Sequence, residues 1–299
     1  MAKLMKGHTW QDACKLVRGK PRFQYPVMVE AKADEIRCRV YKSEWGGILF
    51  ESYAEKPLHN MDGWALTFEL LFHKMQISEL DTGVLVNGNF NDSYRWVRSA
   101  KGFPQEKLDK KTGAVAPALV PSMVQFIVFD VPESPDQYID RMAVADLAAS
   151  DLRQYGVNST RPARILCHHE GDVRDAYNWY RSGGLEGAMV KTTDHLYERR
   201  RTYGWMKLKP QETFDGRITG VNRAHSIAGE PLNRIGSVTV VLEDGSTADP
   251  AGFPHGLGAD IWANPEAYIG KWIEFQAMEV DRAGGYRHPF FKRFREDKA

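Results

Sequence analysis

The sequence has no apolar run near the roughly 18 residues that a membrane-spanning helix needs. Its N-terminus also lacks the apolar segment of a secretory signal peptide, so we expect a cytoplasmic protein. Only 3 cysteines are present, Cys14, Cys38 and Cys167, and they lie far apart. This spacing argues against a disulfide framework and favours buried thiols.

The chain also lacks an excess of charge, because 40 basic residues are balanced by 39 acidic residues. Any affinity for nucleic acid must therefore come from a local basic patch. Three segments qualify as such patches: 101–111, 199–201 and 287–295. With 299 residues, 42% of them hydrophobic, the chain can bury a core and divide into two domains.

Three short strings, at 30–37, 186–191 and 205–210, each place a lysine among charged neighbours on apolar, strand-like sequence. Such sites suit a lysine amine that attacks the α-phosphate of a nucleotide. In the third string, Lys207 and Lys209 share one face, because side chains alternate along a strand. Two neighbouring ammonium groups would form a phosphate clamp.

The pattern before Pro210 alternates strands with helices. The expected helices are 10–17, 61–75, 141–155 and 172–181, and the expected strands are 25–32, 37–41, 83–86, 124–131 and 189–190. We therefore expect an α+β domain over residues 1–212.

After Pro210 the pattern changes to short alternating strands separated by turn residues. The expected strands are 215–221, 236–242 and 272–280, with turns at 243–245 and 283–285. We expect a second, all-β domain over residues 213–299. Its pattern fits a small barrel of the oligonucleotide-binding (OB) type or of the SH3-like type, and periodicity does not separate the two.

Five elements, in this order, resemble the signatures of short phage-type ATP-dependent DNA ligases, within the covalent nucleotidyltransferase superfamily. Residues 32–37 are similar to K-x-D-G-x-R, with Glu35 where glycine is usual, and Phe129-Asp130 matches the strand used for nucleotide stacking. The other elements are 186–191 (E-G-hydrophobic-K), 207–209 (K-x-K) and 293–298 (R-x-D-K). Each element is weak alone, but the ordered set covers nearly the whole chain.

The resemblance implies an adenylation domain followed by an OB-fold barrel, and a reaction in three steps. Lys32 attacks ATP to form lysyl-AMP, AMP passes to the 5′-phosphate of a nick, and the 3′-hydroxyl displaces AMP. Neighbouring cations would lower the lysine pKa and stabilise charge on the phosphates. The resemblance makes Lys32 the nucleophile and gives the supporting cations as Arg37, Lys207 and Lys209, together with Lys191 from the nucleotide-binding element. It also implies nicked duplex DNA as the partner, a monomer, a place in replication or repair, and the host cytoplasm if the protein is viral.

The resemblance also assigns the nucleotide contacts. Phe129 and either Met189 or Val190 would enclose the adenine, and Glu30 would accept its amino group. Asp34 holds the acidic position of the first signature, and Glu186 would ligate Mg²⁺ together with the triphosphate. The terminal residues expected to touch the departing pyrophosphate are Arg295, Asp297 and Lys298.

DNA contacts are expected from arginines near these signatures. They are Arg98 and the run Arg199, Arg200 and Arg201, which lies directly before the phosphate clamp. Without a further N-terminal DNA-binding domain, we expect a minimal enzyme that holds DNA with its 91–111 loop and the barrel.

One departure from the signatures concerns an acidic D-G-E element whose glutamate holds the ribose. After the apolar run 84–86, this chain has Asn87-Gly88-Asn89, so amides replace both carboxylates. An alternative register on 81–83 precedes the apolar run and also lacks the glutamate, and we prefer the first register. Asn89 can hydrogen-bond a ribose hydroxyl but is a poor metal ligand. The hypothesis is an active-site variant with slowed chemistry.

Two further hypotheses remain. One is an RNA ligase or a capping guanylyltransferase, which would share the lysine chemistry but use another strand or nucleotide. The other is a catalytically impaired protein that binds nicked DNA, which the missing carboxylates make plausible.

Overall fold

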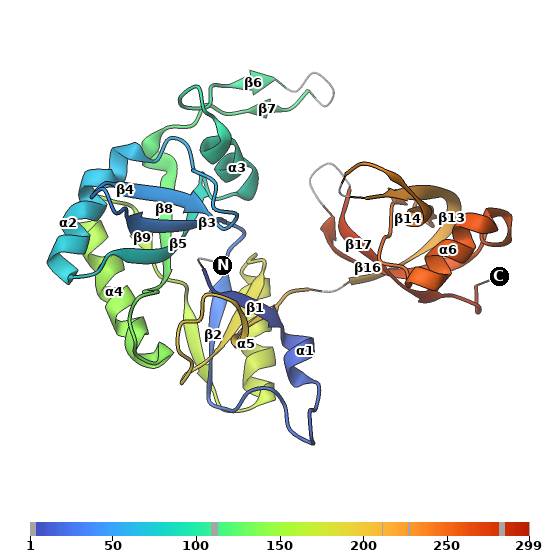
Figure 1. Ribbon diagram of the computed structural model, residues 1–299, viewed down its shortest axis with the longest axis horizontal. Helices are drawn as coiled ribbons and strands as arrows, with labels where there is room; N and C mark the ends of the chain where they lie inside the picture. The colour runs from blue at the N-terminus through green and yellow to red at the C-terminus, as the bar shows by residue number, and fades with distance from the viewer. Residues whose placement is uncertain (1–3, 109–112, 211, 227, 281–284, 299) are drawn as a thin grey trace. The chain divides into compact units, whose positions relative to one another are not determined.

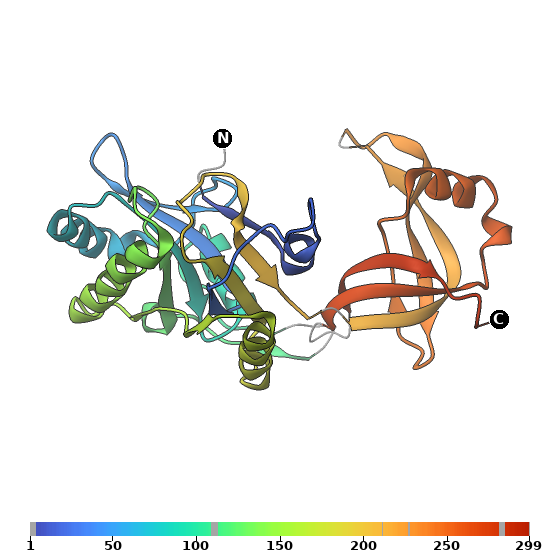
Figure 2. The ribbon, with the colours of Figure 1, turned by 90° about the horizontal axis from the view of Figure 1, so that it is seen from below.

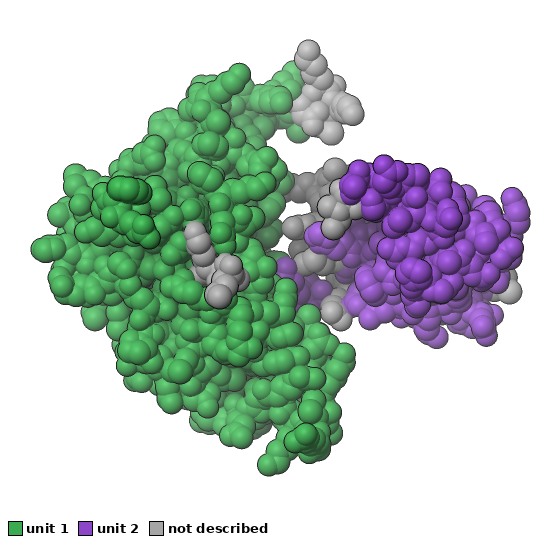
Figure 3. All heavy atoms as spheres, viewed as in Figure 1, with its two compact units in different colours: residues 1–208 green, residues 209–299 purple. Residues whose placement is uncertain are grey.

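The computed structural model describes residues 4–108, 113–210, 212–226, 228–280 and 285–298. It divides into two compact units, Met1–Leu208 (unit 1) and Lys209–Ala299 (unit 2), which Figure 3 shows in green and purple. Residues 109–111 of the predicted basic segment and residues 283–284 of the predicted turn lie outside the described residues. Each unit is described below by itself.

One five-stranded sheet of unit 1, here called the Arg37 sheet, has the order β4-β3-β5-β8-β9. Its strands are β4 (Ile48–Ser52), β3 (Ile36–Lys42), β5 (Glu79–Val86), β8 (Val124–Asp130) and β9 (Ser159–Thr160). Helices α2 (Ala65–Met75) and α4 (Tyr138–Gln154) pack on one face (Figure 1). Along β5, Leu80, Val84 and Val86 point into this core, because side chains alternate along a strand. Asp81 and Gly83 therefore belong to the opposite face.

The second five-stranded sheet of unit 1, here called the Lys32 sheet, has the order β1-β12-β11-β2-β10. Its strands are β1 (Lys6–Thr9), β12 (Arg201–Leu208), β11 (Gly187–Thr192), β2 (Val27–Lys32) and β10 (Arg164–Cys167). Helices α1 (Trp10–Cys14) and α5 (Glu170–Ser182) cover one face, where Val190 and Met206 are buried. The alternate residues Met189, Lys191 and Lys207 belong to the opposite face.

Shorter elements connect strands of the Arg37 sheet. They are η1 (Asp62–Trp64), α3 (Phe90–Arg98), β6 (Lys107–Leu108), β7 (Val115–Ala116) and η2 (Pro121–Met123). The sequence pattern predicted a loop where α3 lies. The helix predicted over 10–17 ends at Cys14, because Lys15 has an extended backbone. None of the helices in the described part of the chain is long and apolar enough to cross a membrane.

Unit 2 contains one five-stranded antiparallel sheet in the order β15-β14-β13-β16-β17. Its elements are β13 (Glu212–His225), β14 (Pro231–Leu242), β15 (Thr247–Ala248), α6 (His255–Ala263), η3 (Pro265–Ala267), β16 (Trp272–Val280) and β17 (Tyr286–Phe294). The predicted all-β composition is wrong, because α6 buries Ile261 in the same core as Val238 and Phe275. Figure 2 shows α6 in orange against these strands. Among the described residues the strand pairings do not close a barrel, so the predicted barrel is not confirmed.

Candidate active site

A cavity of about 370 Å³ lies where the free faces of the two unit 1 sheets meet. This volume is in the range of sites for small molecules and cofactors. The charged and aromatic residues that line it are Lys6, Glu30, Lys32, Glu35, Arg37, Tyr53, Phe129, Lys191, Arg201, Trp205 and Lys207, with Met189 beside them. Both sheets contribute, so each of the three predicted strings supplies residues to this cavity. Among the predicted residues of these strings, Asp34, Glu186, Val190 and Lys209 are not in its lining.

Lys32 is the last residue of β2, and its ammonium group forms an ion pair with the Glu186 carboxylate. The two side chains are 17% and 9% exposed, so the pair is largely shielded from water. The backbone N–H of Glu186 also donates to the Lys32 carbonyl at 3.1 Å. Two residues that are distant in sequence are therefore fixed together at the cavity by both backbone and side chain.

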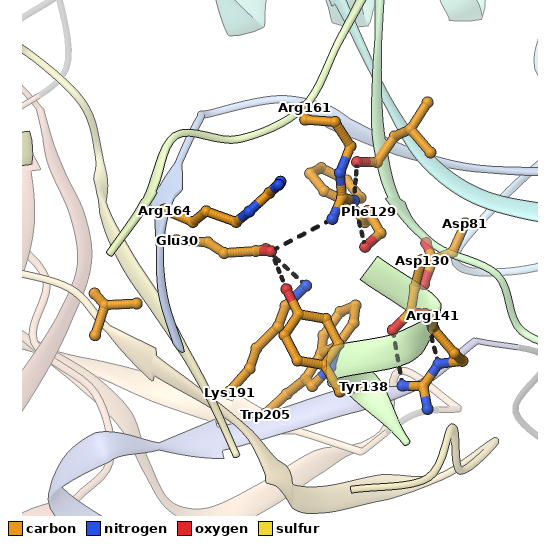
Figure 4. Close-up of polar contacts among 12 residues, drawn as sticks. Glu30, Asp81, Phe129, Asp130, Tyr138, Arg141, Arg161, Arg164, Lys191 and Trp205 are labelled. Atoms are coloured by element: carbon orange, nitrogen blue, oxygen red, sulfur yellow. Dashed lines mark hydrogen bonds and ion pairs between the residues drawn. The ribbon is translucent and has the colours of Figure 1, made fainter. Parts of the chain in front are cut away.

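Glu30 is almost fully buried beside Lys32 and has three polar neighbours (Figure 4). Its carboxylate lies 2.6 Å from Lys191 Nζ and 3.9 Å from Arg161, and it accepts a hydrogen bond from the Tyr138 hydroxyl. The Lys191 ammonium also lies 4.1 Å from the centre of the Trp205 ring. Burial lowers the pKa of Lys191, although Glu30 opposes this effect.

Arg37 lies on β3 and forms a two-pronged ion pair with Asp81 on β5. The Tyr197 hydroxyl donates to the same carboxylate at 2.7 Å. Burial opposes the charge on Arg37, but Asp81 raises its pKa above the ordinary value. The guanidinium lies 5.5 Å from the Phe129 ring and 4.8 Å from the Trp205 ring, so it is held among aromatic groups at the cavity wall.

A buried network behind the cavity holds Trp205 in place. Arg141 is fully buried and bonds Asp130 through two nitrogens, at 2.7 and 3.1 Å. The Trp205 indole N–H donates to His195 Nε2 at 3.0 Å, so Nδ1 carries the proton that is donated to the Thr192 carbonyl. Burial lowers the pKa of His195 to about 4, which keeps the ring neutral near pH 7.

Several predicted residues lie away from the cavity wall. Asn89 is the N-cap of α3, where its side-chain oxygen accepts from the Asp92 backbone N–H at 2.9 Å. Val190 is buried in the core under the Lys32 sheet, whereas Met189 lines the cavity. Asp34 is half-buried in the turn after β2 and is not among the lining residues.

The arginines that the sequence predicted to contact DNA differ in their contacts within the protein. Arg199 is bonded to Glu79 through both terminal nitrogens, at 2.9 and 2.8 Å, and Arg200 pairs with Glu198. Arg201 lines the cavity and donates to the Gly7 carbonyl at 2.8 Å. Arg98, on α3, lies 5.6 Å from the Tyr94 ring.

Unit 2 holds the remaining predicted residues. Arg295 bonds Asp297 through two nitrogens, at 2.8 and 2.7 Å, and Asp215 at 2.7 Å. Lys298 bonds Glu243 at 2.9 Å and lies 3.0 Å from Asp215. Lys209 is the first residue of this unit. The clamp role of Lys209 and the contact of Arg295, Asp297 and Lys298 with pyrophosphate stay predictions.

Sequence reasoning missed Asp81, Tyr138 and Trp205 as residues of the site. Alternation along the third string could have placed Trp205 on the face of Lys207. Asp81 was considered only as part of a less favoured register. Nothing in the sequence pattern around Tyr138 pointed to Glu30.

No protein-family model matches the chain. Two curated proteins are similar to parts of it. The DNA ligase of Enterobacteria phage T3 is 33% identical over 129 residues, which cover 41% of this chain and 37% of that protein. The DNA ligase of Escherichia phage T7 is 28% identical over 149 residues, which cover 42% of this chain and 41% of that protein. The matches thus span about two fifths of the length of these relatives.

Solved structures share the fold over nearly the whole chain. A Lig E DNA ligase superposes with a TM-score of 0.68 at 16% identity, covering 98% of each chain. The ATP-dependent DNA ligase of bacteriophage T7, solved in complex with ATP, gives a TM-score of 0.57 at 17% identity, covering 98% of this chain and 99% of that one. The resemblance inferred from the signatures is confirmed: the chain resembles short phage-type ATP-dependent DNA ligases, in sequence over about two fifths of its length and in fold over nearly all of it.

Proposed function

We propose that this chain is an ATP-dependent DNA ligase that seals nicks in duplex DNA through a lysyl-AMP intermediate. One observation carries the proposal: Lys32 lies in a nucleotide-sized cavity, paired with Glu186, and shares that cavity with Lys191 and Lys207. The relatives named DNA ligase support it, and so does the shared fold of the phage T7 structure that contains ATP.

In the first step the Lys32 amine attacks the α-phosphorus of ATP. A bond forms between Nζ and phosphorus, the bond from phosphorus to the α,β-bridging oxygen breaks, and pyrophosphate leaves. The ammonium group must first lose a proton, and the Glu186 carboxylate is in contact with it to accept that proton. AMP then passes to the 5′-phosphate of the nick, which releases Lys32, and the 3′-hydroxyl displaces AMP.

Different lining residues contact different parts of the nucleotide. Phe129 and Met189 offer apolar surfaces to the adenine, and Glu30 accepts its amino group. Glu30 already accepts from Tyr138 and faces Lys191, but a carboxylate has about four acceptor positions, so capacity remains. Lys191, Lys207 and Arg37 stabilise negative charge on the phosphates in the transition state.

Magnesium fits this site as a companion of the nucleotide. Among the described residues, no three His, Cys, Asp or Glu side chains gather as a metal site. Mg²⁺ is commonly bound through one or two carboxylates plus substrate phosphates, and Glu186 supplies a carboxylate at the cavity. When bound there, the ion would withdraw charge from the phosphate oxygens.

The proposal extends to unit 2 and to DNA. Unit 1 is the adenylation domain, with Asp34 in its first signature, and unit 2 is an OB-type domain. Lys209 forms the phosphate clamp with Lys207, and Arg295, Asp297 and Lys298 contact the departing pyrophosphate. Arg98 and the run 199–201 contact the DNA backbone, so binding is insensitive to sequence and weakens as salt rises. The enzyme acts as a monomer in the cytoplasm.

A nick-sealing assay tests the proposal. A labelled duplex with a single 5′-phosphorylated nick is incubated with the protein, ATP and Mg²⁺, beside matched reactions with GTP and with a nicked RNA strand. We expect joining of the DNA nick with ATP. We expect no joining by the Lys32→Arg variant, which keeps a positive charge beside Glu186 but has no nucleophilic amine. Joining of RNA only, or labelling by GTP only, would overturn the DNA ligase assignment in favour of the related enzymes.

A further inference from the structure

Gly83 occupies the middle of β5, the central strand of the Arg37 sheet, on the face that looks toward the cavity. A glycine inside a strand weakens it, because there is no side chain to pack. The backbone of Gly83 does not have the positive φ that favours glycine, so its conformation is open to any residue. The reason for glycine at this position is therefore space.

The side chain that uses this space is Glu35. A Cβ atom built on Gly83 would overlap Glu35 Cγ and would lie 2.9 Å from two ring carbons of Phe129. Both Glu35 and Phe129 line the cavity. The Glu35 side chain thus lies over β5 beside the Phe129 ring, and it can do so only because residue 83 has no side chain.

The Glu35 carboxylate accepts a hydrogen bond from its own backbone N–H but has no direct partner on another described residue. In the part of the chain that the structure describes, it makes no ion pair and no hydrogen bond to another residue. Burial raises the pKa of the Glu35 carboxyl, and the charges of Lys32 and Arg37, which do not contact it directly, oppose that rise. By contrast, Glu30 is engaged by Lys191 and Tyr138. Glu35 is therefore the lining carboxylate that is free to accept hydrogen bonds from a ligand.

The position of Glu35 identifies which part of a nucleotide it meets. This step rests on the proposed function, in which the base stacks on Phe129 and the α-phosphate meets Lys32. The sugar joins base to α-phosphate and must lie between those two side chains, which is where Glu35 lies. A carboxylate repels phosphate but accepts hydrogen bonds from hydroxyl groups. We propose that Glu35 binds the sugar hydroxyls and selects ribonucleotides over deoxyribonucleotides, in the space that Gly83 leaves open.

The test compares the rates of lysyl-AMP formation with ATP, 2′-deoxyATP and 3′-deoxyATP. A hydrogen bond to a charged group is worth about tenfold or more, so the wild-type chain should use at least one deoxynucleotide about tenfold less efficiently than ATP. In Glu35→Ala this preference should fall below about twofold, and Glu35→Gln should lie between. Equal loss with all three nucleotides, with the preference kept, would assign Glu35 a merely structural role and overturn the inference.

Two further variants test whether a carboxylate on residue 83 can replace the carboxylate on residue 35. Gly83→Glu alone should impair the site, because the new side chain meets Glu35 and Phe129. Combining Gly83→Glu with Glu35→Gly should restore the preference for ATP, since one carboxylate then again occupies that space. If the double variant has the melting temperature of the wild type but shows no restored preference for ATP, the inference that residues 35 and 83 share one space for a carboxylate is contradicted.

A binding measurement separates this inference from the proposed function. Calorimetry on the Lys32→Arg variant, with and without Glu35→Ala, records the affinities for ATP and the two deoxynucleotides without chemistry. Binding of ATP with unchanged discrimination after Glu35→Ala overturns the role of Glu35 alone. A wild-type chain that binds no nucleotide and forms no adenylate removes the proposed function as well.

Discussion

Lys191 Nζ lies 2.6 Å from the Glu30 carboxylate, and each of the two side chains is only 1% exposed. Burying two opposite charges gains little net stability, because both lose their hydration. Removing one partner is costly, because it leaves the other charge buried and unpaired. The pair therefore makes the geometry of the candidate active site and the stability of unit 1 depend on the same residues.

The first prediction is that Glu30→Gln destabilises the protein. The change leaves the Lys191 ammonium buried without its counter-charge, so the free energy of unfolding should fall by about 3–5 kcal/mol, measured by urea denaturation. Lys15→Gln removes an exposed pair with Asp12, in which Lys15 is 72% exposed, and should change the same quantity by less than about 1 kcal/mol. Equal losses in the two variants would refute the cost assigned to the buried pair.

The three lysine strings could be placed from the sequence because each occupies a strand with clear alternation. Lys207 faces the cavity and Met206 the core, as the third string predicted. The first and second strings meet because β2 and β11 pair directly, with Glu30 opposite Met189. The local sequence pattern was therefore sufficient to predict which lysines of these strings face the site.

The second prediction concerns the dependence of stability on pH. The pKa of His195 falls from 6.5 in the unfolded chain to about 4 in the fold. Between these values the unfolded state binds more protons, so stability falls as pH is lowered from 6.5 to 4. The loss should reach about 3 kcal/mol at the lower end of this range.

The control for this pH dependence is His195→Gln, which cannot titrate. Its free energy of unfolding should vary much less between pH 6.5 and 4, measured by urea titrations at each pH. Below this range the carboxylate of Asp130, whose pKa is held down by Arg141 against the effect of burial, adds a further loss in both proteins. A wild-type profile as flat as that of the variant would contradict a neutral, buried His195.

The third prediction separates the two possible roles of Asn89. Because Asn89 caps α3, Asn89→Ala should lower the free energy of unfolding by about 1 kcal/mol. The rate of lysyl-AMP formation should stay within about twofold of the wild type, because Asn89 is not among the residues that line the cavity. A large loss of that rate in a folded variant would instead support the contact with ribose that the sequence predicted.

The contacts that sequence reasoning missed depend on the alignment of strands that are remote in sequence. Asp81 meets Arg37 because the registers of β3 and β5 place Arg37 opposite Gly83 and Arg39 opposite Asp81, on one face. The sequence did not reveal that Asn89 is the N-cap of α3, because it follows the Asn-Gly pair at 87–88, and turns and helix caps favour the same residue types. Helix α6 has two glycines in its nine residues, which weakens any helical signal.

Intact-mass spectrometry of the purified chain after incubation with ATP and Mg²⁺ tests the central claim most directly. The account predicts a mass increase of one AMP, mapped by peptide analysis to Lys32, and no increase in Lys32→Arg. An AMP adduct on another residue would contradict the assignment of the nucleophile. The absence of any adduct, from protein that binds ATP, would contradict the covalent mechanism.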